Sequence, residues 1–346
     1  NLEPYPLDMF LITKSDRSIW NKQVKLITEN ITDEVIDEAF ENIPEEIKGA
    51  TIQEIKRKLK GRKKNLQKIS DLYFNYLNKT QVIKGTQKND WFDIERMPNG
   101  KTKVTVYTIK KGEKNKIIHN RTYDKTETKE IWIYGLDEED VFVVKGNQKK
   151  LIKIKLIGGQ NNDTYKILNG KKVVVYDFKS KKNTFENNKG RKKLTDDYDV
   201  NVYDYKKLKN SNNIVTPTIG FNPDDGIKIG FSDVYTDYGF ERNPFTSQHR
   251  FNASYYFATS GFELNYSSEF ANTFKNWNLG IDATFTSPNF ATNFFGFGNN
   301  SPNPEANKDD KNLDFNRVKI RKLLGGFYIQ WKGDLDAKIK LAVNYQ

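Results

Sequence analysis

The sequence predicts a mainly β protein: an incomplete transmembrane antiparallel β-barrel of about seven strands, preceded by a small helical region and a β-rich domain with a hairpin and a short β-solenoid. Two observations predict this fold class. Segments of strict apolar and polar alternation fill residues 214–346, and 25 of the 46 aromatic residues lie there. Alternation gives a strand one apolar and one polar face, and aromatic girdles are typical of membrane barrels. We therefore divide the chain into a helical region (1–85), a β-rich domain (86–213) and a barrel portion (214–346).

The helical region is indicated by two capped apolar stripes. Thr32 is the expected N-cap of one helix, with acidic residues in the first turn, where the helix dipole favours them. A second helix is expected to begin at Thr51, where Glu54 completes a capping box, and, if unbroken, to reach Leu77. Its other face is basic, and either binds polyanions or is simply a solvated surface. The candidate polyanion patch on this face comprises Lys56, Arg57, Lys60, Lys63 and Lys64.

The β-rich domain contains a hairpin and a short internal repeat. Residues 97–100 predict a turn between two strands. Strand-like residues 131–135 lead to 140–142, and the same pattern recurs 23 residues later, where 154–158 lead to 163–165. A less complete third copy begins at Val173. Equal units of strand and turn predict the stacked rungs of a small β-solenoid.

The turns of this repeat resemble the calcium-binding Gly-Gly-x-Gly-x-Asp motif, and oxygen-rich turns suit Ca²⁺. The candidate ligands are Asp137, Asp140 and Asp163. Asn161 stands where a glycine is expected, so turns with a purely structural role are the alternative. No other cofactor is predicted, because the sequence has two distant histidines and no cysteine, and no catalytic motif is evident.

The barrel strands are expected near 214–221, 227–236, 249–258, 262–271, 277–286, 317–331 and 335–345. The residues predicted to face lipid are Phe262, Leu264, Tyr266, Trp277, Leu279, Ile281, Phe285, Ile339, Leu341 and Val343. Seven strands do not close in the usual even-numbered way, so further strands are expected from elsewhere. The alternative is a soluble all-β module, which would bury Trp277, Leu279, Ile281 and Phe285 against a second sheet.

The charge separates the two parts of the chain. Residues 1–213 hold 44 basic and 31 acidic residues, a net charge of +13, whereas residues 214–346 carry a net charge of −1. A basic domain beside a membrane is drawn to anionic headgroups. No motif that reads nucleic acid accompanies the charge, so no nucleic-acid partner is expected. The barrel prediction places the protein in a Gram-negative outer membrane, in contact with its lipid, with residues 1–213 in the periplasm.

Several motifs resemble one known family. The soluble ones are residues 133–136 with 140–142 and residues 156–159 with 162–165; the barrel ones are 220–226, 250–251 and 293–299. Together they resemble the bacterial surface-antigen family of outer-membrane β-barrels, relatives of the barrel-assembly insertases, in the Bacteroidota type that can be fused to a calcineurin-like metallophosphoesterase.

The resemblance implies a 16-stranded barrel and a role in outer-membrane protein assembly or export, alongside other outer-membrane or periplasmic proteins of a complex. The chain departs from the family in three ways. The phosphoesterase His/Asp motifs are absent, Asp137–Asp140 reads Asp-Glu-Glu-Asp in place of Gly-Gly-Asp-Asp, and the barrel portion covers less than half of 16 strands. POTRA-type repeats are not evident either. The alternative function is therefore the non-catalytic, membrane-anchoring half of a periplasmic metallophosphoesterase.

Overall fold

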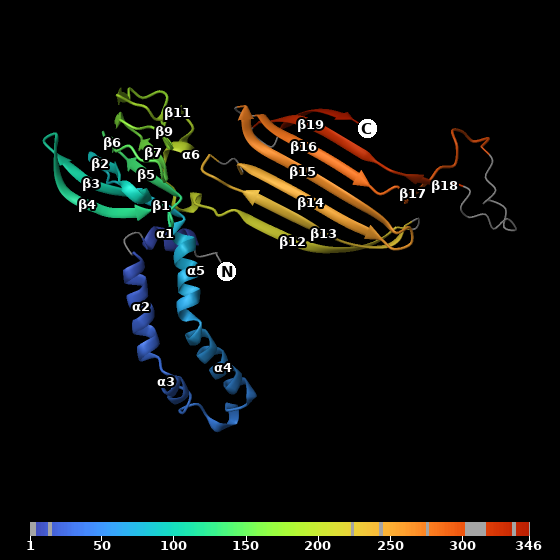
Figure 1. The fold of residues 1–346 in the computed structure, drawn as a ribbon, viewed down its shortest axis with the longest axis horizontal. Coiled ribbons are helices and arrows are strands. Elements are labelled where there is room, and N and C mark those ends of the chain that lie inside the picture. The colour runs from blue at the N-terminus through green and yellow to red at the C-terminus, as the bar shows by residue number, and fades with distance from the viewer. Residues whose placement is uncertain are drawn as a thin grey trace. The chain divides into compact units, whose positions relative to one another are not determined.

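The chain is mainly β and contains antiparallel sheets, as the sequence predicts. The computed structural model describes residues 5–12, 16–222, 225–241, 245–274, 277–301, 316–333 and 337–345. The chain folds as two compact units, residues 1–207 and 208–346. Figure 1 labels their helices and strands. No helix in the described ranges is long and apolar enough to cross a membrane.

The first unit begins with a helical arm made of two antiparallel layers (Figure 1). Helices α1 (Tyr5–Leu11), α2 (Arg17–Asn30) and α3 (Asp33–Glu38) lead through a 3₁₀ turn (Glu45–Ile47) to α4 (Ala50–Lys64) and α5 (Leu66–Asn78). Helix α2 packs along α5, and α3 packs along α4. Arg17 fixes the base of the arm, because its guanidinium donates to Asp71, Asn75 and Glu127 and lies 4.4 Å from the ring centre of Phe74.

The N-cap prediction at Thr32 is confirmed, since its hydroxyl accepts a bond from the Val35 amide. The predicted start of the second helix is wrong, and the helix is not unbroken to Leu77. Gly49, not Thr51, is its N-cap, and Glu54 binds Arg57 instead of completing a capping box. The helix also breaks at Asn65, whose side-chain amide donates to the carbonyl of Gly61. This local bond competes with continuation of the helix.

The rest of the first unit is a stack of parallel β coils, which we call the coil stack. One sheet contains β1 (Thr80–Lys84), β5 (Glu130–Leu136), β7 (Lys153–Gly159), β9 (Val173–Asp177) and β11 (Arg191–Leu194). The other contains β2 (Asp90–Arg96), β6 (Val141–Lys145), β8 (Thr164–Ile167) and β10 (Thr184–Glu186), and continues antiparallel into β3 (Lys101–Lys110) and β4 (Glu113–Asp124). A 3₁₀ turn (Pro98–Gly100) joins β2 to β3.

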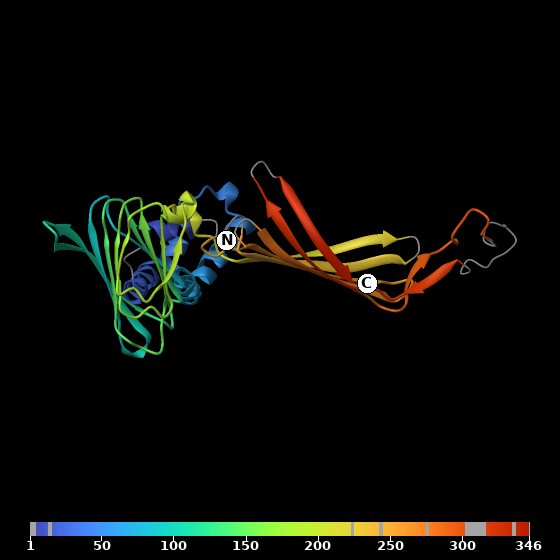
Figure 2. The ribbon, with the colours of Figure 1, turned by 90° about the horizontal axis from the view of Figure 1, so that it is seen from above.

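Each coil contributes one strand to each sheet, and successive coils pair at the spacing of the sequence repeat. Ile131 lies beside Ile154, and Phe142 lies beside Tyr165, in both cases 23 residues apart. The strands stack side by side in Figure 2. The short helix α6 (Tyr198–Asn201) contacts β7 and β9, and a 3₁₀ turn (Tyr205–Lys207) follows it.

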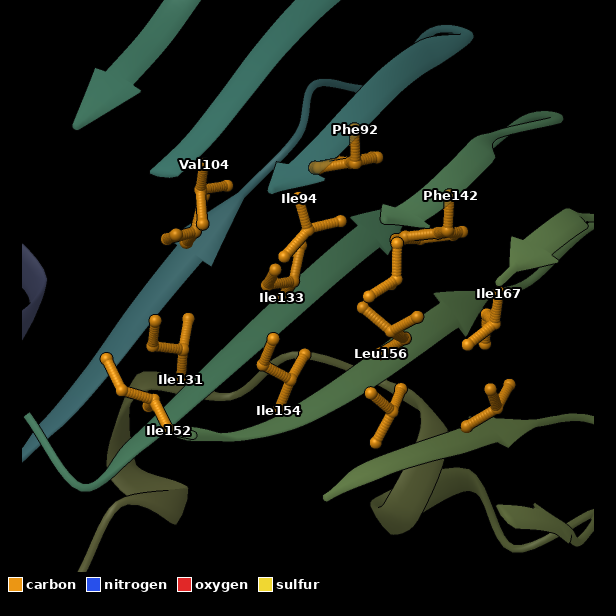
Figure 3. Close-up of a cluster of buried hydrophobic side chains, with 14 of the residues drawn as sticks. Phe92, Ile94, Val104, Ile131, Ile133, Phe142, Ile152, Ile154, Leu156 and Ile167 are labelled. Atoms are coloured by element: carbon orange, nitrogen blue, oxygen red, sulfur yellow. The ribbon is translucent and has the colours of Figure 1, made fainter. Parts of the chain in front are cut away.

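The core of the coil stack lies between its two sheets (Figure 3). Branched aliphatic side chains such as Ile131, Ile154 and Leu156 point from one sheet toward aromatic and aliphatic side chains of the other, and all three are fully buried. In the second sheet the rings of Phe92, Phe142, Tyr165 and Phe185 stack, with successive centres 4.7, 5.1 and 5.2 Å apart. Identical side-chain positions in consecutive coils therefore pack directly on one another.

The second unit is a seven-stranded antiparallel sheet with its strands in chain order. The strands are β12 (Asn212–Asn222), β13 (Gly226–Asp237), β14 (Ser247–Tyr256), β15 (Gly261–Phe274), β16 (Trp277–Thr286), β19 (Leu323–Lys332) and β20 (Lys338–Tyr345). Strands β17 (Phe290–Asn293) and β18 (Arg317–Ile320) form a separate two-stranded sheet. Residues 335–336 of the predicted strand at 335–345, and residues 223–224 of the motif at 220–226, lie outside the described ranges.

One predicted strand of this unit is wrong. Residues 317–331 are not a single strand, because β18 pairs with β17 and only β19 pairs with β16. The division falls at Lys322, whose amide donates to the hydroxyl of Thr286 and whose carbonyl accepts from the Thr286 amide. These two bonds fix the last residue of β16 to the start of β19, so residues before Lys322 leave the large sheet.

Candidate functional site

The seven-stranded sheet presents one apolar face on all of its strands. Cross-strand pairing places Leu264 opposite Phe285, Ile281 opposite Phe327, and Ile329 opposite Leu341. Because side chains alternate along a strand, each such row belongs to one face. The register places all ten predicted lipid-facing residues on it: Phe262, Leu264, Tyr266, Trp277, Leu279, Ile281, Phe285, Ile339, Leu341 and Val343.

This apolar face is uncovered in the part of the chain that the structure describes. Ile219 is 82% exposed and Val343 is 78% exposed. Trp277, Leu279, Ile281 and Phe285 are only partly buried, and no second sheet of the described unit packs over them. A soluble sandwich would bury these four side chains, so the arrangement differs from what that alternative requires.

The tryptophans of this sheet lie at one end of the apolar face, where Trp277 pairs with Trp331. At the other end, the rings of Phe262 and Phe285 lie 5.7 Å apart. Asp233 interrupts the face, since it pairs with Val215 on one side and Phe251 on the other. One of its carboxylate oxygens is buried without a hydrogen-bond partner.

The opposite face is polar and is hydrogen-bonded from strand to strand. Asn278 donates to Glu269 at 2.6 Å, Thr284 donates to Asn265 at 2.8 Å, and Tyr256 donates to Glu263 at 3.0 Å. The Tyr328 ring covers Gly280 so closely that a Cβ there would lie 1.9 Å from a ring carbon. Polar groups that bond across strands are suited to a hydrated surface, and they would be costly against lipid.

The coil stack contains a ladder of buried carboxyl groups at one of its corners. The Asp140 carboxylate accepts the amide of Asp90 at 2.7 Å, and Asp163 accepts the amide of Asp140 at 2.8 Å. Asn183 continues the series by accepting the amide of Asp163 at 2.8 Å. Gly135 and Gly158 make room for the second oxygens of Asp140 and Asp163, which a Cβ would approach to 2.1 and 2.2 Å.

Burial dominates the electrostatics of this aspartate ladder. It raises the pKa of Asp140 to about 9, and the neighbouring Asp163 carboxyl adds to the rise. Burial also raises the pKa of Asp163 and of Asp90. One oxygen of each of these three groups has no hydrogen-bond partner. A carboxyl that cannot be solvated or paired favours its protonated form, so burial holds the pKa of Asp140 and of Asp163 above neutral pH.

The predicted calcium ligands are therefore not assembled around one point. One carboxyl oxygen of Asp140 and one of Asp163 accept a hydrogen bond from a backbone amide, whereas the partly exposed Asp137 accepts one from the side chain of Asn161. Within the described ranges no group of three or more Asp, Glu, His or Cys side chains is placed to hold a metal ion. Calcium binding at these turns stays a prediction.

The candidate polyanion patch on α4 is largely neutralised by its neighbours. Lys60 binds Asp37 at 2.7 Å, Arg57 binds Glu54 at 2.7 Å, and Lys63 binds Asp33. Lys56 also approaches Asp37, at 3.5 Å, whereas Lys64 is exposed. Most of this positive charge therefore holds α4 against α3, and less of it is left for a polyanion.

The aspartate ladder was not predicted, although the sequence contains a signal for it. Glycine precedes the ladder carboxyl by five residues in Gly85–Asp90, Gly135–Asp140 and Gly158–Asp163. This spacing places the glycine at a strand end and the carboxyl after the corner in each coil.

Comparison of the chain with protein-family models, curated proteins and solved structures found no match. The family resemblance accordingly stays a prediction.

Proposed function

We propose that residues 208–346 form part of a transmembrane β-barrel in a Gram-negative outer membrane, and that residues 1–207 lie in the periplasm. The apolar face of the seven-stranded sheet meets lipid and the polar face lines the lumen. The observation that carries this proposal is the uncovered apolar face, which extends over all seven strands. A contiguous apolar surface of this extent marks an interaction site. Lipid is the partner that fits it here, because a membrane can cover the whole face and its acyl chains are apolar.

The strand lengths support the same proposal. Strands β14, β16 and β19 each contain 10 residues. At about 3.3 Å per residue such a strand is about 33 Å long. Tilted by about 45°, it spans roughly 23 Å, close to the apolar band of about 25 Å in outer-membrane barrels. In the described chain β12 and β20 pair on one side only, and barrel closure assigns further strands to these two edges.

The proposed biological role is in outer-membrane protein assembly or export, as a component of a complex with other outer-membrane or periplasmic proteins. Two features support it: the resemblance of the motifs to surface-antigen barrels, and a first unit with an extended coil stack and a helical arm that offer surface to partners. Depletion of the protein in its native host should lower the amounts of other outer-membrane β-barrel proteins. Unchanged amounts, together with phosphatase activity that copurifies with the native protein, would favour the enzyme-anchor alternative.

The membrane placement is tested with single cysteines, because the chain has none of its own. A polarity-sensitive fluorophore is attached at Leu279 or Ile281 on the apolar face, and at Asp282 or Thr284 on the polar face of the same strand. In lipid vesicles we expect blue-shifted emission at the first two positions and not at the last two. Quenchers carried on lipid chains should act on the same two positions. Equal emission at all four positions would contradict a lipid-facing sheet.

Asp233 provides a second test of the same placement. A carboxyl on a lipid-facing surface is unfavourable, so Asp233→Leu should stabilise the protein in vesicles against urea by about 1–2 kcal/mol. Thr216→Leu, on the polar face of β12, serves as the control and should not stabilise. A less stable Asp233→Leu variant would mean that this carboxyl has a specific partner instead of lipid.

A further inference from the structure

The corner of the coil stack that lies away from the aspartate ladder is strongly basic. It is formed by the loops that join β6 to β7, β8 to β9 and β10 to β11, which parallel pairing aligns along one edge of the stack. Residues 145–152, 168–172 and 187–191 comprise these loops together with the last residue of β6 and the first residue of β11, and they contain seven basic residues and no acidic residue. The exposed basic side chains that we call the lysine ridge are Lys149, Lys150, Lys171, Lys172, Lys189 and Arg191.

The lysine ridge differs from the α4 patch in its pairing. None of its six residues forms an ion pair with an acidic residue of the described chain. By contrast, Lys60 and Lys63 on α4 are held by Asp37 and Asp33. An unpaired row of ammonium groups repels itself, and a counter-charge from outside the chain relieves that repulsion.

The loops hold this row in a fixed spacing. Asn169 donates to the carbonyl of Gly146 and to the side chain of Asn147, which ties the second loop to the first. Gly170 lies so close under the third loop that a Cβ would come within 1.7 Å of the Lys189 carbonyl oxygen. Parallel strands set successive loops about 4.8 Å apart. The basic side chains are therefore presented as a regular array on a rigid surface.

A buried arginine side chain lies beneath the same corner. Arg96 of β2 is 3% exposed and donates to the carbonyl of Ile152 at 2.6 Å. Its second donor faces the carbonyl of Lys171 at 3.5 Å, and the Nε atom has no partner. No carboxylate neutralises this guanidinium within the described ranges, so its field adds to that of the lysine ridge.

We infer that the lysine ridge binds the phosphate-bearing headgroups of an anionic phospholipid surface. Leu168 distinguishes this partner from nucleic acid: it is 52% exposed between the basic side chains, where it can insert among lipid headgroups. The three loops contain no aromatic side chain on which a base could stack. The inference rests on the proposed function only in that a membrane is within reach of the first unit.

The test uses the full chain and vesicles of phosphatidylcholine with or without phosphatidylglycerol. Co-flotation at low and high salt separates the two membrane contacts. Binding through the sheet should occur with both lipid mixtures, whereas binding through the lysine ridge should appear only as the increment from phosphatidylglycerol and should weaken in high salt. If the sheet does not bind lipid, binding to pure phosphatidylcholine is lost and the phosphatidylglycerol increment is still measured.

The decisive variant carries Lys149, Lys150, Lys171 and Lys189 replaced by glutamine. Each lysine near an anionic surface contributes about fivefold to binding, so the increment should fall by on the order of several hundredfold. The matched control replaces four residues of the α4 patch (Lys56, Lys60, Lys63 and Lys64) by glutamine, and should keep most of the increment. Circular dichroism checks that both variants fold.

Three results would overturn the inference. The first is an increment that the ridge variant retains in full. The second is an equal loss in the α4 control, which would mean that only net charge matters. The third is ridge-dependent binding to a single-stranded oligonucleotide without ridge-dependent binding to vesicles, which would assign the site to a nucleic acid.

Discussion

Replacing a carboxyl of the aspartate ladder by an amide should stabilise the protein at neutral pH. In Asp140→Asn the side-chain oxygen still accepts the amide of Asp90, while the ionisable group is removed. The chain itself supplies the precedent, because Asn183 occupies the last position of the ladder with the same kind of bond. The expected gain comes from the folded-state pKa of Asp140, which burial raises from 3.8 to about 9.

The magnitude follows from proton linkage. At pH 7 the unfolded carboxyl is ionised and the folded one is protonated, so folding must bind a proton. Each pKa unit between 3.8 and 7 costs 1.36 kcal/mol, an upper limit of about 4 kcal/mol. A gain of about 1–3 kcal/mol is expected after relaxation of the site. The wild-type protein should lose this stability as the pH rises from about 4 toward 9. The variant should lose less, because only the raised pKa values of the remaining buried carboxyls, such as Asp163, still oppose folding.

The assay is hydrogen exchange of β5 to β9 over that pH range, since it reports on the coil stack alone in a chain with two units. Below pH 4 the two proteins should differ little, because the carboxyl is then protonated in both the folded and the unfolded state. Asp137→Asn, at a partly exposed position outside the ladder, should change stability by less than about 0.5 kcal/mol. An Asp140→Asn variant less stable at pH 7 would refute the reasoning and indicate an ionised carboxyl with a bound cation.

Three further substitutions, two of them with a matched control, test the packing. Arg17→Ala removes the bonds at the base of the helical arm and should loosen it by about 1–2 kcal/mol, seen as faster proteolysis of the arm with an unchanged coil core. Gly158→Ala places a methyl group against the Asp163 carboxyl and should lower the free energy of unfolding in urea by about 3 kcal/mol or more. The control Gly61→Ala, in an open helix position, should raise it by about 0.5–1 kcal/mol. Gly280→Ala should disturb the ring that covers it and lower the yield of folded sheet in vesicles, while Gly325→Ala, with no neighbour within 4 Å, should not; equal effects would contradict the close ring contact.

Periodicity predicted much of the second unit because alternation is a local property that cross-strand pairing preserves. The strand over residues 277–286 has the bounds that the sequence predicts. The single predicted strand at 317–331 failed because the sequence gives no local sign that Lys322 bonds to Thr286, a residue 36 positions away. The helix break at Asn65 was not predicted for a different reason. Its cause is local, but an asparagine inside an apolar stripe is a weak signal for the end of a helix.

The charged sites were harder to predict than the strands. The basic run on α4 is typical of a polyanion patch. Its partners Asp33 and Asp37 lie on α3, and the sequence alone does not show that pairing. The lysine ridge is dispersed over three loops in the sequence, and only the stacking of coils collects it. The sequence shows that the turns near Asp140 and Asp163 are rich in oxygen atoms, but it does not show that both carboxyls are buried and bonded to backbone amides.

The coil stack also determines how the first unit opens under load. A stack in which each coil touches only its neighbours is stabilised by a sum of nearest-neighbour terms, so it unravels from its ends. Its last coil is the shortest, with three residues in β10 and four in β11. Beyond it the chain runs through α6 directly into the second unit. A pulling force on the second unit is therefore expected to detach the last coil, β10 and β11, first. The remaining coils then unfold one after another, so the coil stack unfolds in steps and not in a single transition.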